Sequence, residues 1–333
     1  MFQKKKIILS YDYELFFGDR SGTVLRSLIE PTNLLLDAMD SVSFKGNFFV
    51  DWQMLKYLKE ANTERTLADH QLIIDQLKDM LYRGHRIELH IHPHWVDAKY
   101  NGDGTWDFSE FRHYSLNSFS EKEIVDMFVE GTNLLTNIAR EVDSEYKIVA
   151  FRAGGWAVQP FDKLKKGFQK AGIKIDSSPC KGFCAKHTNF FYDFRVMSDS
   201  SIYHFSNDVC KEDPAGEFLE IPITPLKRPF VVKVIERLYQ LLTNNCEYLT
   251  DGTHHRSNDN DPCDESYKMD NDLKMLSLYL SPYSIPIVIN MYKDRDLLCF
   301  IQHPKDQTGM TNKSIKALNS LCASITYKDL LEL

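Results

Sequence analysis

The chain has 333 residues, of which 43% are hydrophobic and 26% are charged, an ordinary globular composition that excludes disordered, collagen-like and disulfide-scaffold chains. Lys and Arg total 40 and Asp and Glu total 47, so the formal net charge is −7. This balance argues against a nucleic-acid surface, which needs clustered positive charge. No apolar run approaches the roughly 18 residues of a transmembrane segment. The seven cysteines form no disulfide framework, so we expect reduced thiols and a cytoplasmic location.

Short β-branched or aromatic runs alternate with amphipathic segments, which is typical of β/α units around a mainly parallel sheet. In chain order we predict strands at 6–12, 47–51, 86–92, 148–152, 173–177, 218–224, 297–302 and 324–327. We predict helices at 33–39, 70–83, 121–141, 161–171, 231–242 and 312–321. Polar segments near 95–119 and 250–268 interrupt the alternation and are predicted as loop insertions. No linker is evident, so residues 1–333 are predicted to form a single domain.

The third predicted strand carries ionisable side chains on one of its faces. Because strand side chains alternate, Glu88, His90 and His92 share a face. Burying such groups is costly unless they are paired or bind a metal. Pro93 ends regular strand pairing, so that His94 can turn back toward His90. Imidazole suits zinc and its neighbours, so three histidines in five residues predict a metal site. The spacing alone leaves open which pair binds.

Other strand ends carry residues of catalytic type. Asp12 and Glu14 share a face at the end of the first strand, and Arg152, Asp176 and His303 end later strands. The active sites of β/α barrels lie at this end of the strands. One carboxylate can bind a metal while its neighbour acts as a base. Together these positions predict an active site built from several strands.

The order Asp-x-Glu, His-x3-His, Arg before Gly-Gly, Asp-x-x-Pro and Ile-x-His-Pro resembles the five motifs of the polysaccharide deacetylases. These are the carbohydrate esterases with the chitooligosaccharide-deacetylase (NodB) homology domain. Segments 90–95 and 151–156 resemble a branch associated with bacterial polysaccharide biosynthesis. The resemblance spans roughly residues 6–328. It implies an α/β fold, a distorted (β/α)7 barrel, with a divalent metal that is usually Zn²⁺ and sometimes Co²⁺ or Ni²⁺.

The resemblance also implies roles for individual residues. The implied metal ligands are Glu14, His90 and His94. The implied catalytic residues are Asp12 as the general base, Arg152 holding that base, Asp176 tuning the acid, and His303 as the general acid. We expect substrate contacts from His92, Trp95, Gly155 and Trp156. The chain departs from the family at Tyr13, where a second aspartate is usual, at Gly154, where proline is usual, and at the additional His92.

The resulting hypothesis is a metal-dependent hydrolase that removes N-acetyl groups from an amino sugar in a glycan or a cytoplasmic glycan precursor. Its expected partner is a carbohydrate substrate, and the sequence does not indicate an oligomeric state. One alternative keeps the fold but cleaves another amide C–N bond, as in cyclic imide or ureide hydrolases, some of which need no metal. A second alternative is an inactive sugar-binding protein. Against it, every motif position keeps a residue of catalytic type.

Overall fold

The computed structural model describes residues 4–18, 20–244, 246–254, 267 and 269–332, and it is organised around one curled, mainly parallel sheet. Among these residues, seven strands follow one another in parallel along the main path of the sheet, and an eighth, β15 (Cys322–Ser324), pairs parallel with β1 beside that path. In spatial order the seven are β11 (Phe218–Glu220), β7 (Ile175–Asp176), β6 (Ala150–Ala153), β3 (Arg86–Ile91), β2 (Gly46–Asp51), β1 (Lys5–Tyr13) and β14 (Leu297–Gln302). The α/β class and the distorted-barrel prediction are confirmed, with the sheet forming a half-barrel.

The open side of the half-barrel is bridged by an irregular segment, residues 221–224. The amide of Ile221 donates to the carbonyl of Asp176 at 3.0 Å, which extends the pairing of β11 with β7 by one hydrogen bond. At its other end, the amide of Thr224 donates to the carbonyl of Cys299 in β14, also at 3.0 Å. The two edges of the sheet are thus joined without a regular strand pair, which accounts for the distortion of the barrel.

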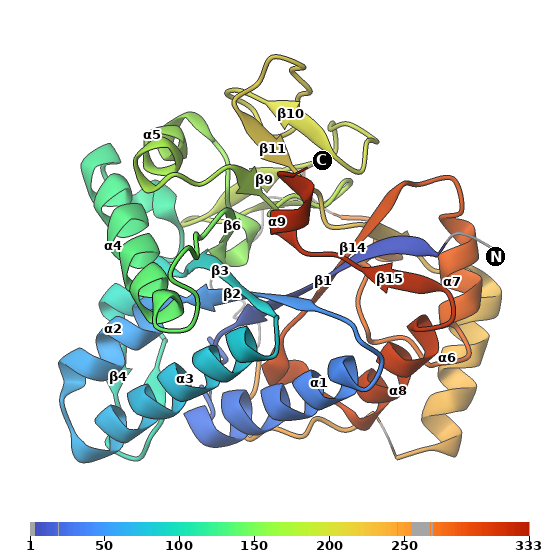
Figure 1. Ribbon diagram of the computed structural model, residues 1–333, viewed down its shortest axis with the longest axis horizontal. Helices are drawn as coiled ribbons and strands as arrows, with labels where there is room; N and C mark the ends of the chain where they lie inside the picture. Colours follow the sequence, from blue (N-terminus) through green and yellow to red (C-terminus); the bar gives the residue numbers. More distant parts are fainter. Residues whose placement is uncertain (1–3, 19, 245, 255–266, 268, 333) are drawn as a thin grey trace.

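Helices surround the outside of the sheet (Figure 1). They are α1 (Glu30–Asp40), α2 (Trp52–Ala61), α3 (Glu64–Tyr82), α4 (Glu121–Arg140), α5 (Asp162–Ala171), α6 (Phe230–Leu242), α7 (Ile285–Met291) and α8 (Gly309–Leu318), with a π-helical turn at Leu25–Ile29 before α1. The short helix α9 (Tyr327–Leu330) instead lies over the middle of the sheet in the view of Figure 1, and its Tyr327 and Leu330 belong to the same buried cluster as Ile8 and Phe49. The Ser120-x-x-Glu123 capping box expected at the start of α4 is present. No helix in the described part of the chain is both long and apolar enough to cross a bilayer.

The predicted elements agree with the structure except at short or abruptly joined segments. Helix α2 follows β2 without a turn, and α7 is only seven residues long, so neither was predicted. The final strand prediction is wrong at its end, because β15 (Cys322–Ser324) stops early and the Thr326 side chain caps α9.

Small elements decorate the loops. Segment 95–119 contains the hairpin of β4 (Lys99–Tyr100) and β5 (Trp106–Asp107), between 3-10 turns at Pro93–Asp97 and Leu116–Ser118. Residues 255–266 and 268 of the other predicted insertion lie outside the described residues. The remaining short strands are β8 (Cys184–Lys186), β9 (Phe191–Asp193), β10 (Tyr203–Phe205), β12 (Pro225–Lys227) and β13 (Leu273–Met275), and a 3-10 turn spans Pro304–Asp306.

Glu88 joins β3 to the start of β6. Its fully buried carboxylate accepts hydrogen bonds from the amides of Val149 and Ala150 at 2.8 and 2.9 Å. It also accepts one from Nε of Arg86 at 2.7 Å. The charge is therefore neutralised and fully hydrogen-bonded, which a buried carboxylate requires. This contact fixes β6, which carries Arg152 into the barrel.

We predict that Glu88→Gln lowers the free energy of unfolding by about 3 kcal/mol. The substitution breaks the buried ion pair with Arg86 and can place the glutamine NH₂ group against the N–H donors of Val149 and Ala150. Urea denaturation measures this change. The control is Glu141→Gln, at an exposed ion pair with Lys78, where we expect little change. Equal stability of wild type and Glu88→Gln would contradict the role given to this carboxylate.

Candidate active site

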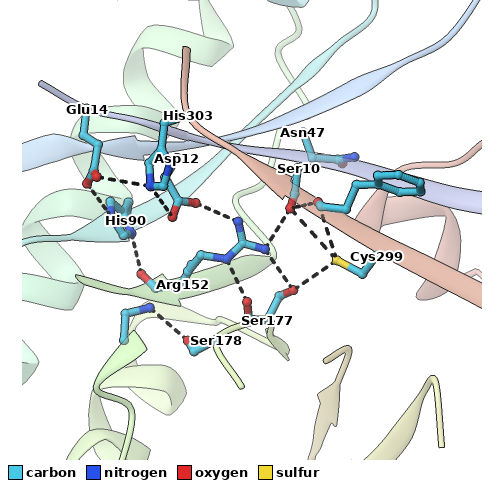
Figure 2. A network of polar contacts seen from close by, with 12 residues as sticks. Ser10, Asp12, Glu14, Asn47, His90, Arg152, Ser177, Ser178, Cys299 and His303 are labelled. Carbon is cyan, nitrogen blue, oxygen red and sulfur yellow. Dashed lines mark hydrogen bonds and ion pairs between the residues drawn. The ribbon is translucent and has the colours of Figure 1, made fainter. Parts of the chain in front are cut away.

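Most of the predicted site residues meet at the C-terminal ends of the barrel strands. Asp12 lies in β1 and Glu14 directly follows it, His90 lies in β3, and His303 follows β14 (Figure 2). His92 directly follows β3. These residues line one cavity of about 260 Å³, together with Phe17, Tyr114, Gly155, Trp156, His254 and Lys305. Parallel strands gather their ends at one edge, so residues separated by almost the whole chain become neighbours.

Three of these side chains form a cluster that fits a metal ion. One ligand atom each from Glu14, His90 and His92 lies within 4.8 Å of the others, and all three residues are buried. Nδ1 of His90 donates to the carbonyl of Arg152 at 2.8 Å, so Nε2 faces the carboxylate of Glu14, also at 2.8 Å. Such a bond on the second ring nitrogen is how metal-binding histidines are normally oriented. One carboxylate and two imidazoles suit zinc or cobalt.

Electrostatics keep this cluster ready to bind a cation. Burial alone would raise the pKa of Glu14, but the Lys305 ammonium, His92 and His90 lower it well below its ordinary value. Burial lowers the pKa of His90, but its hydrogen bond to Glu14 and the charge of Asp12 raise it to about 9. The proton on Nε2 of His90 therefore lies between the imidazole and the Glu14 carboxylate, at the place where a bound metal cation would lie.

His94 lies behind His92 and outside this cluster. The Nδ1 atoms of the two rings are 2.6 Å apart, while Nε2 of His92 is 3.8 Å from Glu14. Burial lowers the pKa of both rings, that of His94 to about 3, so both are neutral at pH 7. Nε2 of His94 is buried without a partner in the described residues. His92 is therefore the third member of the cluster, and His94 as a metal ligand stays a prediction.

Arg152 holds Asp12 from inside the barrel (Figure 2). Its guanidinium donates to Oδ1 of Asp12 at 2.7 Å, to Oγ of Ser10 at 2.8 Å and to the carbonyl of Ser177 at 2.8 Å. Arg152 has no exposed surface and stacks over the Phe49 ring, with 4.2 Å from Cζ to the centroid. Such a charge-assisted hydrogen bond fixes the direction of the Asp12 carboxylate.

His303 faces Asp12 across the cavity. Its Nε2 lies 3.6 Å from Oδ2 of Asp12 and 3.5 Å from Oε1 of Glu14. Its Nδ1 lies 3.1 Å from Oδ2 of Asp306, which also pairs with His254. Burial, followed by the Lys305 charge, lowers the pKa of His303 to about 4. The carboxylate that orients this ring is therefore Asp306.

Asp176 makes no hydrogen bond or ion pair with His303 in the described structure, and its expected role in tuning the acid stays a prediction. Its carboxylate accepts from the hydroxyl and the amide of Ser178, at 2.8 and 3.2 Å. Its register partner is Glu220 on β11. Both oxygens of Glu220 are buried, and no N–H or hydroxyl of a described residue reaches them. A proton shared with Asp176 is then what satisfies this carboxyl, so the pair is structural.

The expected substrate contacts divide into two groups. Trp95 is completely buried, donates to Asp51 at 2.5 Å and packs on Trp106, so it has no face to offer a sugar. Gly155 and the half-buried Trp156 do line the cavity. Gly155 has φ +58°, and a Cβ there would lie 2.6 Å from Tyr114. The glycine therefore lets the backbone approach the cavity wall.

Sequence reasoning missed several residues of the cavity. Lys305 donates to Glu14 and to the carbonyl of Leu15, both at 2.8 Å, and lies over the Phe17 ring. Asp306 is the partner of His303. Lys305 and Asp306 directly follow the predicted His303-Pro304 motif, so the three-residue spacing from His303 to Asp306 could have predicted that these two side chains make contact. Phe17 and Tyr114 come from loops without a periodic pattern.

No protein-family profile and no curated protein matches the sequence. Among solved structures, the chain is similar to a provisionally named polysaccharide deacetylase from Mycobacterium smegmatis, at 13% identity and a TM-score of 0.45, covering 96% of this chain and 84% of the other. It is also similar to Puue allantoinase, at 9% identity and a TM-score of 0.47, covering 98% and 89%. For the 4-alpha-glucanotransferase from Thermococcus litoralis the values are 12% and 0.49, covering 99% of this chain and 40% of that one. The three activities differ and every score is below 0.5, so the assignment of function below rests on the geometry of the site.

The Asp176–Glu220 pair generates a prediction about pH. Burial raises the pKa of Asp176 to about 6 and that of Glu220 well above its ordinary value. A carboxyl that binds its proton more tightly when folded contributes stability below its unfolded pKa. That contribution is lost as the pH rises through the folded pKa. The free energy of unfolding should therefore fall from about pH 4 upward through pH 6.

We predict that Glu220→Gln is more stable than wild type at pH 8, by on the order of 1 kcal/mol, and that this gain shrinks toward pH 4. Chemical denaturation at the two pH values measures it, with exposed Glu217→Gln as the control. A variant less stable than wild type at pH 8 would show that the two carboxyls do not share a proton.

Proposed function

We propose that this protein is a metal-dependent amide hydrolase that removes the N-acetyl group of an amino sugar. The observation that carries the proposal is the buried Glu14–His90–His92 cluster beside an Arg-held Asp12 and opposite His303. Metal-dependent amide hydrolysis uses an electrophilic metal, a base for water and an acid for the amine. The cavity offers a residue for each. The motif order described above favours an acetylated sugar, within a glycan or a cytoplasmic precursor.

The proposed ligands are Glu14, His90 and His92, with His94 orienting the His92 ring. Zinc in such a site acts as a Lewis acid toward water and toward a carbonyl oxygen. Asp12 is the base, because Arg152 ties up Oδ1 and leaves Oδ2 facing the cavity. It takes the proton of the attacking water. The backbone near Gly155 and the Lys305 ammonium lie on the cavity wall, where they can stabilise negative charge on the carbonyl oxygen.

His303 delivers a proton to the departing amine. Its Nδ1 lies against Asp306, which holds the ring and stabilises the imidazolium that forms while Nε2 carries the proton. Nε2 lies 3.6 Å from Asp12, so the group that collects a proton and the group that donates one face the same small volume. Because its pKa is about 4, the ring is neutral at pH 7, so Nε2 receives the proton that Asp12 takes from the attacking water and passes it to the departing amine.

A second candidate function is hydrolysis of another amide C–N bond at this site without a metal. Lys305 favours it, because its ammonium already contacts Oε1 of Glu14 at 2.8 Å and supplies positive charge within the cavity. Measuring zinc content together with turnover on N-acetylated sugars and on cyclic imides separates the two candidates.

The ligand set is tested by zinc titration. We predict that His90→Ala and His92→Ala abolish micromolar zinc binding, whereas His94→Ala weakens it about ten- to a hundredfold, as for loss of an orienting partner. The control is exposed His204→Ala, which should bind zinc as wild type does. If His92→Ala binds normally and His94→Ala does not, the third ligand is His94.

The proton-transfer roles are tested by turnover. We predict that Asp12→Asn retains zinc but lowers kcat at least about a hundredfold on an N-acetylated amino sugar, because the base is lost. Asp306→Asn should retain zinc, lower kcat and shift the pH profile, because it no longer stabilises the imidazolium. Normal kcat for zinc-loaded Asp12→Asn would refute its role as the base.

A further inference from the structure

A second pocket opens on the other side of His303. It has a volume of about 300 Å³ and shares His303 and Trp156 with the catalytic cavity. Its walls come from the hairpin of β12 and β13, from the segment after β13 and from the end of β14. The two pockets therefore adjoin at His303 and Trp156.

This pocket carries two cations that make no ion pair within the described part of the chain. Arg228 and Lys274 line it, and neither makes an ion pair with a described residue. The lysines beside the pocket differ, since Lys227 pairs with Asp270 at 2.8 Å and Lys233 with Asp272 at 2.7 Å. Nε of Arg228 is buried with no hydrogen-bond partner in the described part of the chain. A buried donor left unpaired costs free energy, which a ligand oxygen would recover.

Among the described residues, the acidic side chain in this lining is Asp306, and it is already engaged. Asp306 bonds to His254 at 2.5 Å and to His303 at 3.1 Å, so its charge is directed at two imidazoles. The remaining polar lining includes Tyr279, whose hydroxyl donates to the carbonyl of Asp306 at 2.9 Å. The free charge in the pocket is thus positive.

We propose that this pocket binds an anionic group, a phosphate or a carboxylate, on the amine-bearing part of the substrate. This proposal rests on the proposed function for its direction: His303 protonates the leaving amine, so the fragment beyond His303 is the sugar and not the acetyl group. An arginine fork and a nearby ammonium match the oxygens of either anion. Trp156, at the junction of the pockets, offers an aromatic face to the sugar ring.

The ligand class is therefore an acidic N-acetylated amino sugar of about one residue in size on this side. A neutral chain of N-acetylated sugars would leave Arg228 and Lys274 unpaired. A phosphate on the sugar and a carboxylate on the sugar satisfy the pocket equally well, so the probes have to separate them.

Binding is measured by fluorescence titration without reference to turnover. The probes are N-acetylglucosamine 6-phosphate, N-acetylglucosamine 1-phosphate, N-acetylmuramic acid and neutral N-acetylglucosamine. We expect at least one anionic probe to bind ten times more tightly than the neutral sugar, with an affinity that falls as salt rises. The anion that binds tells phosphate from carboxylate. Arg228→Gln/Lys274→Gln should lose the preference, whereas Lys227→Gln, the paired neighbour, should keep it.

Equal binding of anionic and neutral probes, or no binding of any probe, would overturn the proposal. So would an unchanged preference in Arg228→Gln/Lys274→Gln with a wild-type thermal midpoint. If the double variant does not fold, the same preference is measured on Arg228→Gln and on Lys274→Gln separately, together with its salt dependence in wild type. A preference that neither single variant reduces and that salt does not weaken would overturn the proposal. Repeating the titration on zinc-free His90→Ala separates the two proposals, because anion binding there persists even if the protein is not a metal-dependent deacetylase.

Discussion

The buried ion pair between Arg152 and Asp12 is the contact on which the rest of the site depends. A guanidinium with no exposed surface is tolerated only because its donors find Asp12, Ser10 and Ser177. These partners come from β1 and from the residue after β7, so the pair ties opposite walls of the half-barrel together. The same bond fixes the free oxygen of Asp12 toward His303, while the Arg152 carbonyl orients His90. One residue thus sets the geometry of both Asp12 and the Glu14–His90–His92 cluster.

Much of this arrangement could be predicted from the sequence, because it follows from strand periodicity. Side chains two apart on a strand share a face, which places Asp12 with Glu14 and His90 with His92. Parallel strands bring such ends together, which explains how residues 12 and 303 meet. The long strands β1, β3 and β14 were predicted almost to the residue for the same reason.

The rest depends on contacts that no local pattern encodes. Trp95 follows the histidines in sequence, but its indole packs inward on Trp106 and reaches Asp51, so proximity in the chain did not mean exposure. Asp176 was linked to His303 by motif order, whereas the fold pairs it with Glu220 across neighbouring strands. Lys305 and Asp306 belong to a 3-10 turn whose direction is set by tertiary packing. Spacing could not rank His92 against His94, because their difference lies in a ring contact after Pro93.

We propose that the end of the barrel holds a metal between β1 and β3, and an anomalous difference map at the zinc absorption edge, from crystals of the zinc-loaded protein, examines this site directly. We expect one strong peak at bonding distance, about 2.0–2.2 Å, from a carboxylate oxygen of Glu14 and from Nε2 of His90 and His92. A map with no peak there, with Lys305 still bonded to Glu14, or a peak held by other residues, would contradict it.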